Sequence, residues 1–447
     1  MSAELLSAPG IEQLRDIAGW AARELRGAAD YLQVFAESTL AVSVECTSGE
    51  PSATCGDLRE GLGCLALKDG RWRYKAVTPD QVDTVADWLG APRPAATPPW
   101  VPGPGAAGFR PVDPQAWLVG QDGDPYSVRS VEDATYRRYA VADSEGAAYA
   151  GASYTLRRRV EAGLLAAGRR YRGLSRWLRK GTAAVDADAS VEDLVNTALG
   201  HARDSAKAAF IGKHRTPVVF GPSAAAGFLH ELVGHALEAD NFRLDSDYIK
   251  GLRRPGALPA ALSLRDDPTV EHGYGSYPAD DEGFTATVTT LLQNGEIGSP
   301  VTCLRTAQRG GLRRTANARR VDFRSPAIPR AANTVVVPGA DDPALLLRGE
   351  GSGVLHVGGL GAGMINLGTG EFSFAALNCH YLTPNGDRVP ARDVSLVGNA
   401  LDTLARLEGI GSDFGGDNAT CGKQGQLIGI GLYSPSMRYA ALDWSAA

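Results

Sequence analysis

The chain has 447 residues, of which 44% are hydrophobic and 21% are charged, the proportions of an ordinary soluble globular protein. This length exceeds what one compact core normally holds, so two or three domains are expected. A formal net charge of −6 and a pI near 5.7 argue against a surface built to neutralise nucleic-acid phosphates.

No stretch of about 18 uncharged apolar residues occurs, so no membrane span is expected. Residues 1–11 include Glu4 and lack the basic segment and short apolar core of an export signal. The six cysteines are thinly spread through the chain, which fits a reducing compartment better than a disulfide framework. The sequence therefore predicts a cytoplasmic protein.

Helical periodicity opens the chain, with an apolar face made of Leu14, Ile17, Ala18, Ala21 and Leu25. Alternation over residues 40–44 predicts a strand, and the runs on either side of Lys68-Asp69-Gly70 predict a hairpin within 62–77. The apolar stripe of residues 82–89 predicts a second helix. Residues 1–91 are therefore expected to form a small N-terminal α+β domain.

The rest of the chain divides by composition. Residues 92–113 are rich in proline and glycine and predict an exposed linker. Residues 114–214 form a polar middle region that ends in a helix, where Ser190 and Asp193 have capping-box spacing. Residues 215–447 are expected to form a Gly-rich, mainly β C-terminal domain that begins with a strand and a helix. The predicted fold class is α+β, with a small N-terminal α/β unit and a mixed middle region.

The segment 223–240, SAAAGFLHELVGHALEAD, carries the clearest chemical signal. His230 and Glu231 are adjacent, and His235 follows five residues after the first histidine. A spacing of four would stack the two imidazoles on one helix face, whereas five rotates the second by roughly 140° on an ideal helix. Both rings can still meet one metal ion if the helix is widened by a π-bulge or unwound between them, and Gly234 is a residue that tolerates such a distortion.

These residue types suit a catalytic zinc site. Neutral imidazoles bind Zn²⁺, and a catalytic zinc lowers the pKa of its water to about 7. Glu231 can take the proton of that water as it attacks a carbonyl, and can pass the proton to the leaving amine. Two histidines that fall by chance near an acidic neighbour are the alternative. Periodicity does not name a third ligand, and the chemically admissible side chains are His356, Cys379, His380, Cys421, Glu238 and Asp240.

Several motifs occur in order beyond the two histidines. TPVVFGPSAAAGFLHELVGHALEAD at 216–240 is followed by ADDEG at 279–283, ANTVVVPG at 332–339, GEFSF at 370–374, SLVGNA at 395–400 and TCGKQGQLIGIG at 420–431. Together these segments resemble the TldD branch of the TldD/PmbA metallopeptidases. The likeness is strong over roughly residues 215–435 and fainter in the N-terminal half, through DYLQVFAES and REGLGCLALKDGRW.

The resemblance implies a zinc ion held by His230, His235 and Cys421, with Glu231 as the general base. A thiolate is a strong zinc ligand, and such a set leaves a position for water. The resemblance also implies a heterodimer with a homologous, metal-free TldE/PmbA-like subunit. Its substrates would be unfolded or short peptides, bound in extended form at strand edges. The expected activity is hydrolysis of peptide bonds, which includes the maturation of one specific peptide in a dedicated pathway.

Asp280, Asp281 and Glu282 form an acidic triplet before Gly283. The triplet is expected to bind a peptide amine or to support the zinc site, and a solvated turn is the alternative. Lys423 is expected to be an electrostatic neighbour of the metal site.

A basic run lacks the interleaved aromatic residues of a nucleic-acid module, so no nucleic-acid partner is expected. Pairing with acidic surface, binding a substrate carboxylate and contacting the partner subunit are the expected roles. The run consists of Arg305, Arg309, Arg313, Arg314, Arg319, Arg320, Arg324 and Arg330.

Two other functions are compatible with the sequence. The first keeps the zinc but changes the substrate, giving an amidohydrolase that acts on a small-molecule biosynthetic intermediate. The second is a non-catalytic binding or regulatory subunit, which would contain no stoichiometric zinc.

Overall fold

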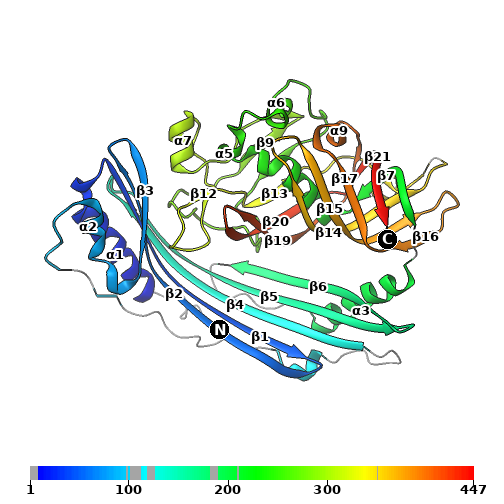
Figure 1. The fold of residues 1–447 in the computed structure, drawn as a ribbon, viewed down its shortest axis with the longest axis horizontal. Coiled ribbons are helices and arrows are strands. Elements are labelled where there is room, and N and C mark those ends of the chain that lie inside the picture. The colour runs from blue at the N-terminus through cyan, green and yellow to red at the C-terminus, as the bar shows by residue number, and fades with distance from the viewer. Residues whose placement is uncertain are drawn as a thin grey trace.

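The computed structural model describes residues 9–96, 99–100, 112–117, 126–181, 190–208, 211–349 and 351–446. The fold is α+β, as predicted, with a long curved sheet that lies along one side of a C-terminal unit (Figure 1). Most of the predicted linker lies outside the described residues. Within the described ranges, none of the helices combines the length and apolar character needed to cross a bilayer.

Six antiparallel strands in the order β3-β2-β1-β4-β5-β6 form the first sheet. Their bounds are β1 (Tyr31–Thr47), β2 (Glu50–Lys68), β3 (Arg71–Val77), β4 (Tyr126–Asp143), β5 (Ala148–Ala166) and β6 (Arg169–Gly181). The predicted hairpin turn is confirmed, since β2 ends at Lys68 and β3 begins at Arg71. Because β1 pairs with both β2 and β4, the sheet runs across the predicted linker. The domain boundaries themselves stay predictions.

Three helices cover parts of this sheet: α1 (Pro9–Glu24), α2 (Thr84–Leu89) and α3 (Val191–Lys207). The apolar face predicted for the first helix is buried with residues of β1, β2 and β4. The predicted cap of α3 is present, because the Ser190 side chain accepts a hydrogen bond from the Asp193 N–H. A Cβ at Gly173 of β6 would lie 1.8 Å from the carbonyl oxygen of Ala198, so this glycine allows α3 to lie against the strand.

The C-terminal unit contains two larger sheets. The second sheet has the order β10-β9-β8-β13-β20-β19. The third has the order β14-β7-β21-β17-β15-β16, and an additional pairing of β14 with β15 closes five of its strands into a ring. The strands are β7 (Gly212–Phe220), β8 (Leu264–Asp266), β9 (Thr289–Gln293), β10 (Glu296–Ile297), β11 (Ala318–Arg319), β12 (Ile328–Pro329), β13 (Asn333–Val336), β14 (Val354–Ile365), β15 (Glu371–Leu382), β16 (Arg388–Ala391), β17 (Val394–Asn399), β18 (Leu407–Ile410), β19 (Gly415–Lys423), β20 (Gln426–Ser434) and β21 (Met437–Ala446).

Helix α4 (Pro222–Leu229) joins the two sheets of this unit. Phe228 stacks on Phe220 with ring centroids 4.6 Å apart and belongs to the core of the strand ring. Ala226, on another side of the same helix, packs with Cys421 and Ile430 of the β19–β20 hairpin. Apolar contacts on both sides therefore fix the end of α4, where His230 follows. The remaining helices are short: α5 (Ala239–Phe242), α6 (Asp247–Leu252), α7 (Leu304–Gly310), α8 (Pro343–Leu346) and α9 (Ala400–Leu404).

Candidate metal centre

The helix changes its winding at the histidine motif. α4 continues into a π-helical turn over His230–Gly234 and then a 3₁₀ turn over His235–Leu237. The N–H of His235 donates to the carbonyl oxygen of His230, the i→i−5 bond that characterises a π turn. This widening places side chains five residues apart on one face, as the motif required. A Cβ at Gly234 would lie 3.4 Å from Nδ1 of His230, so glycine also leaves room for that ring.

Three side chains converge beside this turn. The Cys421 Sγ lies 3.3 Å from Nε2 of His230 and 3.1 Å from Nε2 of His235. The ligand atoms of all three side chains lie within 4.8 Å of one another, and all three are buried or nearly so. In the described part of the chain, no other group of three His, Cys, Asp or Glu side chains has the closeness that a metal ion needs. Of the six admissible third ligands, the structure thus brings Cys421 to the histidines.

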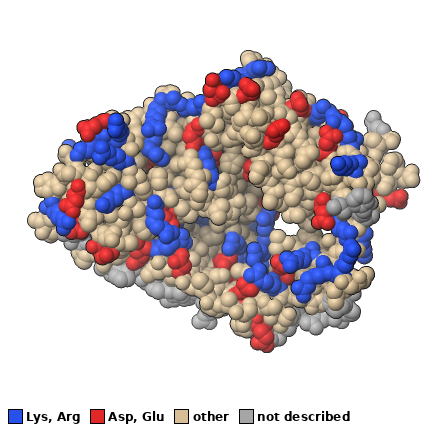
Figure 2. Space-filling model, viewed as in Figure 1, with Lys and Arg blue, Asp and Glu red and all other residues tan. Residues whose placement is uncertain are grey.

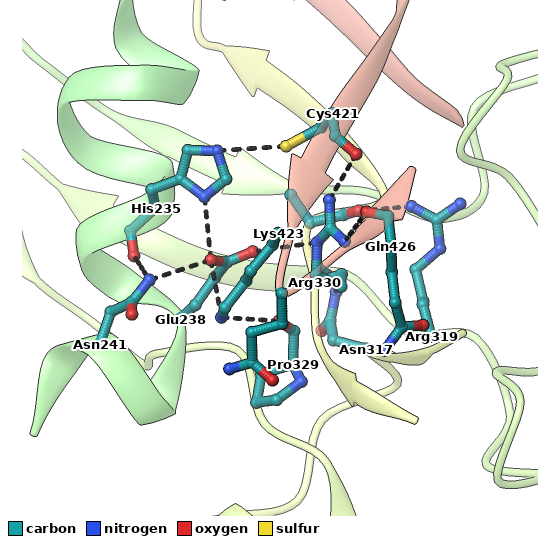
Figure 3. A network of polar contacts seen from close by, with 12 residues as sticks. His235, Glu238, Asn241, Asn317, Arg319, Pro329, Arg330, Cys421, Lys423 and Gln426 are labelled. Atoms are coloured by element: carbon teal, nitrogen blue, oxygen red, sulfur yellow. Dashed lines mark hydrogen bonds and ion pairs between the residues drawn. The ribbon is translucent and has the colours of Figure 1, made fainter. Parts of the chain in front are cut away.

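The carboxylate of Glu238 contacts Nδ1 of His235, the ring nitrogen that does not face Cys421. Its Oε2 lies 2.9 Å from Nδ1 of His235, and the same oxygen accepts hydrogen bonds from Asn241 at 3.2 Å and Lys423 at 3.0 Å (Figure 3). The Nε of Arg330 lies 3.6 Å from the other oxygen. A hydrogen bond from Nδ1–H to this carboxylate leaves the lone pair of Nε2 free for a metal ion. Glu238 was among the admissible third ligands, but in the structure it orients the imidazole of His235 instead.

The other two side chains are held in a similar way. Nδ1 of His230 lies 3.0 Å from the Thr334 hydroxyl of β13, which turns Nε2 toward the sulfur. Arg330 donates to the carbonyl oxygens of Cys421 at 2.7 Å and Gln426 at 3.1 Å, and so holds the β19–β20 hairpin in place (Figure 3). Each donor of the group thus has a neighbour that fixes its orientation.

The charges of the group favour a cation. Burial raises the pKa of the Cys421 thiol, but His230 and His235 outweigh it and lower that pKa to about 4. Burial lowers the pKa of His235, yet Glu238 and Cys421 raise it well above its ordinary value. Glu238 has a pKa of about 2, because His235, Lys423 and Arg330 outweigh the effect of its burial. A thiolate and two imidazoles are a donor set that fits Zn²⁺. A bound ion would take the place of the proton on Nε2 of His235.

Glu231 lies at the edge of the group. Its Oε2 is 3.8 Å from Nε2 of His235, and its side chain is 27% exposed. The carboxylate therefore adjoins the three donors and is also accessible to water. This position is compatible with proton transfer to and from a molecule bound there.

Comparisons with known proteins identify the family of the chain. A sequence profile of the PmbA/TldA metallopeptidase C-terminal domain matches residues 213–444. The chain belongs to this family. A metalloprotease of Methanothermobacter thermautotrophicus is 35% identical over 224 residues, which are 50% of this chain and 49% of that protein. A metalloprotease TldD homolog of Buchnera aphidicola is 29% identical over 225 residues, 50% of this chain and 46% of its own. The chain therefore spans about half the length of the curated relatives it matches.

The fold itself is shared over a longer stretch. TldE from Thermococcus kodakarensis superposes with a TM-score of 0.73 at 18% identity, over 98% of this chain and 100% of that chain. A candidate modulator of DNA gyrase from Bacteroides thetaiotaomicron gives a TM-score of 0.71 at 16% identity, over 98% and 99% of the two chains. These structures show the fold of the PmbA/TldA family, and the curated relatives are named metalloproteases.

In this PmbA/TldA family member the acidic triplet lies outside the His₂Cys group. All three residues are buried rather than solvated. Asp280 accepts hydrogen bonds from three backbone N–H groups, Asp281 pairs with Arg137 at 2.9 Å, and Glu282 accepts from the Leu304 N–H at 2.7 Å. These contacts hold the surrounding loops together. A role for the triplet in substrate binding stays a prediction.

The contact between Glu238 and His235 gives a first testable expectation. Glu238→Gln is expected to lower zinc affinity by about 10- to 100-fold, the usual effect of removing an outer partner of a metal-ligating histidine. The amide keeps the shape but removes the negative charge that Lys423 and Arg330 neutralise. Competition with a zinc chelator measures the effect, and Glu408→Gln, which removes an exposed carboxylate from its ion pair with Arg438, is the control. Equal affinity in the two variants would rule out the orienting role.

Proposed function

We propose that this chain is a zinc-dependent peptidase that hydrolyses peptide bonds in unfolded or short peptides, including the maturation of a specific peptide. The observation that carries the proposal is the convergence of His230, His235 and Cys421 beside the accessible carboxylate of Glu231. The three side chains would hold the zinc ion. When bound there, zinc supplies a Lewis acid that polarises a carbonyl and lowers the pKa of water.

Side chains of the protein transfer the proton and orient the metal ligands. Glu231 takes the proton of the attacking water and returns it to the leaving amine. Glu238 keeps His235 in one tautomer, and Thr334 keeps the ring of His230 turned toward the sulfur. These held orientations mean that little rearrangement is needed when the substrate arrives.

An extended peptide has a strand available for pairing beside the metal group. In the described topology β19 is the terminal strand of the second sheet, and it carries Cys421 near its end. Pairing of the substrate backbone with the outer edge of β19 would bring a peptide bond past the three donors. The edge position of this strand supports binding by strand addition.

The proposal includes a heterodimer with a homologous TldE/PmbA-like subunit. The outer face of the strand ring is apolar at several positions, with Met364 71% exposed, Val397 50% and Leu377 43%. Met364 and Val397 both pair opposite Ser373, so they lie on the same face. The TldE chain has the same fold over its full length, which makes it a suitable type of partner.

Zinc removal tests the proposed function. We expect the purified protein, with its partner subunit present, to contain stoichiometric zinc and to cleave an unfolded peptide library. Activity should disappear with a chelator and return with added Zn²⁺, because the proposed hydrolysis depends on the zinc ion that the three side chains would hold. Protein that purifies and reconstitutes without zinc would instead favour a binding or regulatory subunit. Full zinc content without peptide cleavage would favour the amidohydrolase.

A further inference from the structure

A cavity lies between the first sheet and the C-terminal unit, away from the metal group. Its volume is about 650 Å³. The molecule is hollowed where the curved sheet faces the C-terminal unit, and basic side chains gather along this hollow (Figure 2). A cavity of this size is large enough for one or a few amino-acid residues.

One wall is the inner face of the first sheet. Lys180 of β6 pairs opposite Thr155 of β5, and Thr155 pairs opposite Thr135 of β4, so the three side chains share a face. Arg137 lies two residues after Thr135 and therefore shares that face as well. All four residues line the cavity. The strand register thus places two cations on one wall, next to hydroxyl groups.

The opposite wall comes from the second sheet and its loops. Arg319 lines the cavity and donates to the carbonyl oxygen of Gly429 at 2.7 Å. The lining of the cavity includes Leu427, Ile428 and Gly429 of β20 but none of His230, His235 and Cys421, so the cavity is distinct from the metal group.

Two cationic side chains of the cavity have N–H groups without a hydrogen-bond partner. Within the described ranges, the Lys180 ammonium makes no hydrogen bond or ion pair. Arg137 binds Glu37 at 2.6 Å and Asp281 at 2.9 Å, but its Nη2 is buried and has no partner among the described residues. Burial and the guanidiniums of Arg319 and Arg137 lower the pKa of Lys180 to about 7. The positive charge of Lys180 is therefore unfavourable without an anion, and a bound anion would offset that penalty.

The three acidic residues of the cavity lining do not supply that anion. Glu271 is 89% exposed and its Oε1 lies 3.8 Å from Nε2 of His272. Asp281 is already bound by Arg137 and by the backbone N–H of Arg320 at 2.7 Å. Asp280 accepts from three backbone N–H groups. Between the charged groups the wall includes apolar surface from Ala152, Ala286 and Leu427, which suits the carbon atoms of a peptide.

We propose that this cavity anchors a carboxylate of the substrate peptide through Lys180 and Arg137, at a site separate from the scissile bond. The carboxylate comes either from an acidic side chain or from the peptide C-terminus. The proposed peptidase function supplies the identity of the ligand, whereas the site itself rests on the cavity, the unpaired ammonium of Lys180 and the free Nη2 of Arg137. A carboxylate here would make charge-assisted hydrogen bonds with both groups.

Binding of matched peptides tests the site without requiring cleavage. The probes are four labelled Ala-rich peptides that carry either Glu or Gln at one internal position and either a free or an amidated C-terminus. Affinity is measured by fluorescence anisotropy on the zinc-loaded complex carrying Glu231→Gln, so that the peptides stay intact. Lys180→Met is compared with Lys250→Met, which removes an exposed lysine from α6, outside the cavity.

We expect Lys180→Met to weaken binding of the carboxylate-bearing peptide by about tenfold or more, with the Gln amide peptide unaffected. Loss confined to the Glu peptides identifies a side-chain carboxylate, and loss confined to the free-acid peptides identifies the C-terminus. Lys180→Arg should retain the preference, and unchanged zinc content and melting temperature confirm a folded protein. Equal affinities for all four peptides, or no effect of Lys180→Met beyond that of Lys250→Met, would overturn the proposal.

The outcome for this cavity can be separated from that for the peptidase. If the acidic peptides bind through Lys180 but the wild-type complex cleaves no peptide, the site stands and the proposed function fails. If the wild-type complex cleaves all four peptides equally and Lys180→Met changes neither KM nor kcat, the proposed function stands and the cavity proposal fails.

Discussion

Cys421→Ala is expected to remove zinc from the protein and to abolish peptide hydrolysis. Its sulfur lies 3.3 Å and 3.1 Å from the two facing imidazole nitrogens, and its pKa of about 4 makes it a thiolate at neutral pH. Removing an outer partner of a ligand costs about 10- to 100-fold in metal affinity, so loss of the ligand itself should exceed about 100-fold. Metal analysis after dialysis against a weak chelator measures the loss.

Cys379→Ala is the matched control for this substitution. Cys379 is also buried and lies on β15 of the strand ring, but burial alone raises its pKa to about 12, so it is a neutral thiol. Removing it deletes a similar volume from the core and should leave zinc content unchanged. If Cys421→Ala retained wild-type zinc affinity, the third ligand would have to be a different side chain.

The sequence predicted the chemistry of the metal group more completely than its geometry. His230, Glu231 and His235 were recognisable from residue type, and the need for a wider helix followed from their spacing. The π turn over His230–Gly234 meets that need. The approach of Cys421 joins residues 191 positions apart, and this contact depends on α4 packing against the β19–β20 hairpin. Local periodicity carries no information on such a contact, so the resemblance alone indicated it.

The groups that orient the ligands were harder to predict. Thr334 lies within the segment ANTVVVPG, but nothing in that segment signals a hydrogen bond to a distant histidine. Glu238 was recognised as a metal-binding residue type, yet its position three residues after His235 places it beside Nδ1 rather than Nε2. Which ring nitrogen a carboxylate reaches depends on the 3₁₀ turn that separates them.

The long strands β4, β5 and β6 are the largest part of the fold that sequence patterns did not predict. A strand is recognised by apolar residues that alternate with polar ones. In this sheet the face that lines the cavity carries Arg137 and Lys180, and the apolar residues of the other face are interrupted by the buried charged residues Glu132, Arg138 and Arg158. The charged residues that obscure the alternating pattern of these strands also make the cavity a candidate binding site. By contrast, residues 215–447 were expected to be Gly-rich and mainly β, and β14 lies within them.

Glu231→Gln is expected to reduce peptide hydrolysis by about 10²- to 10⁴-fold, the range that a positioned general base contributes. The substitution keeps the size of a side chain that is 27% exposed and whose oxygen lies 3.8 Å from Nε2 of His235. It removes the ability to accept and return a proton. Zinc content should be unchanged, since the three donors stay in place.

The contrast between Glu231 and Glu238 makes this test specific. Both carboxylates adjoin His235, but Glu238 is buried and fixed by Lys423 and Arg330, whereas Glu231 is accessible to water. Glu231→Gln should therefore lower kcat at full zinc occupancy, and Glu238→Gln should lower zinc affinity and recover activity when zinc is added in excess. Single-turnover hydrolysis of one peptide at saturating zinc measures the difference. Wild-type kcat in Glu231→Gln would show that another group moves the proton.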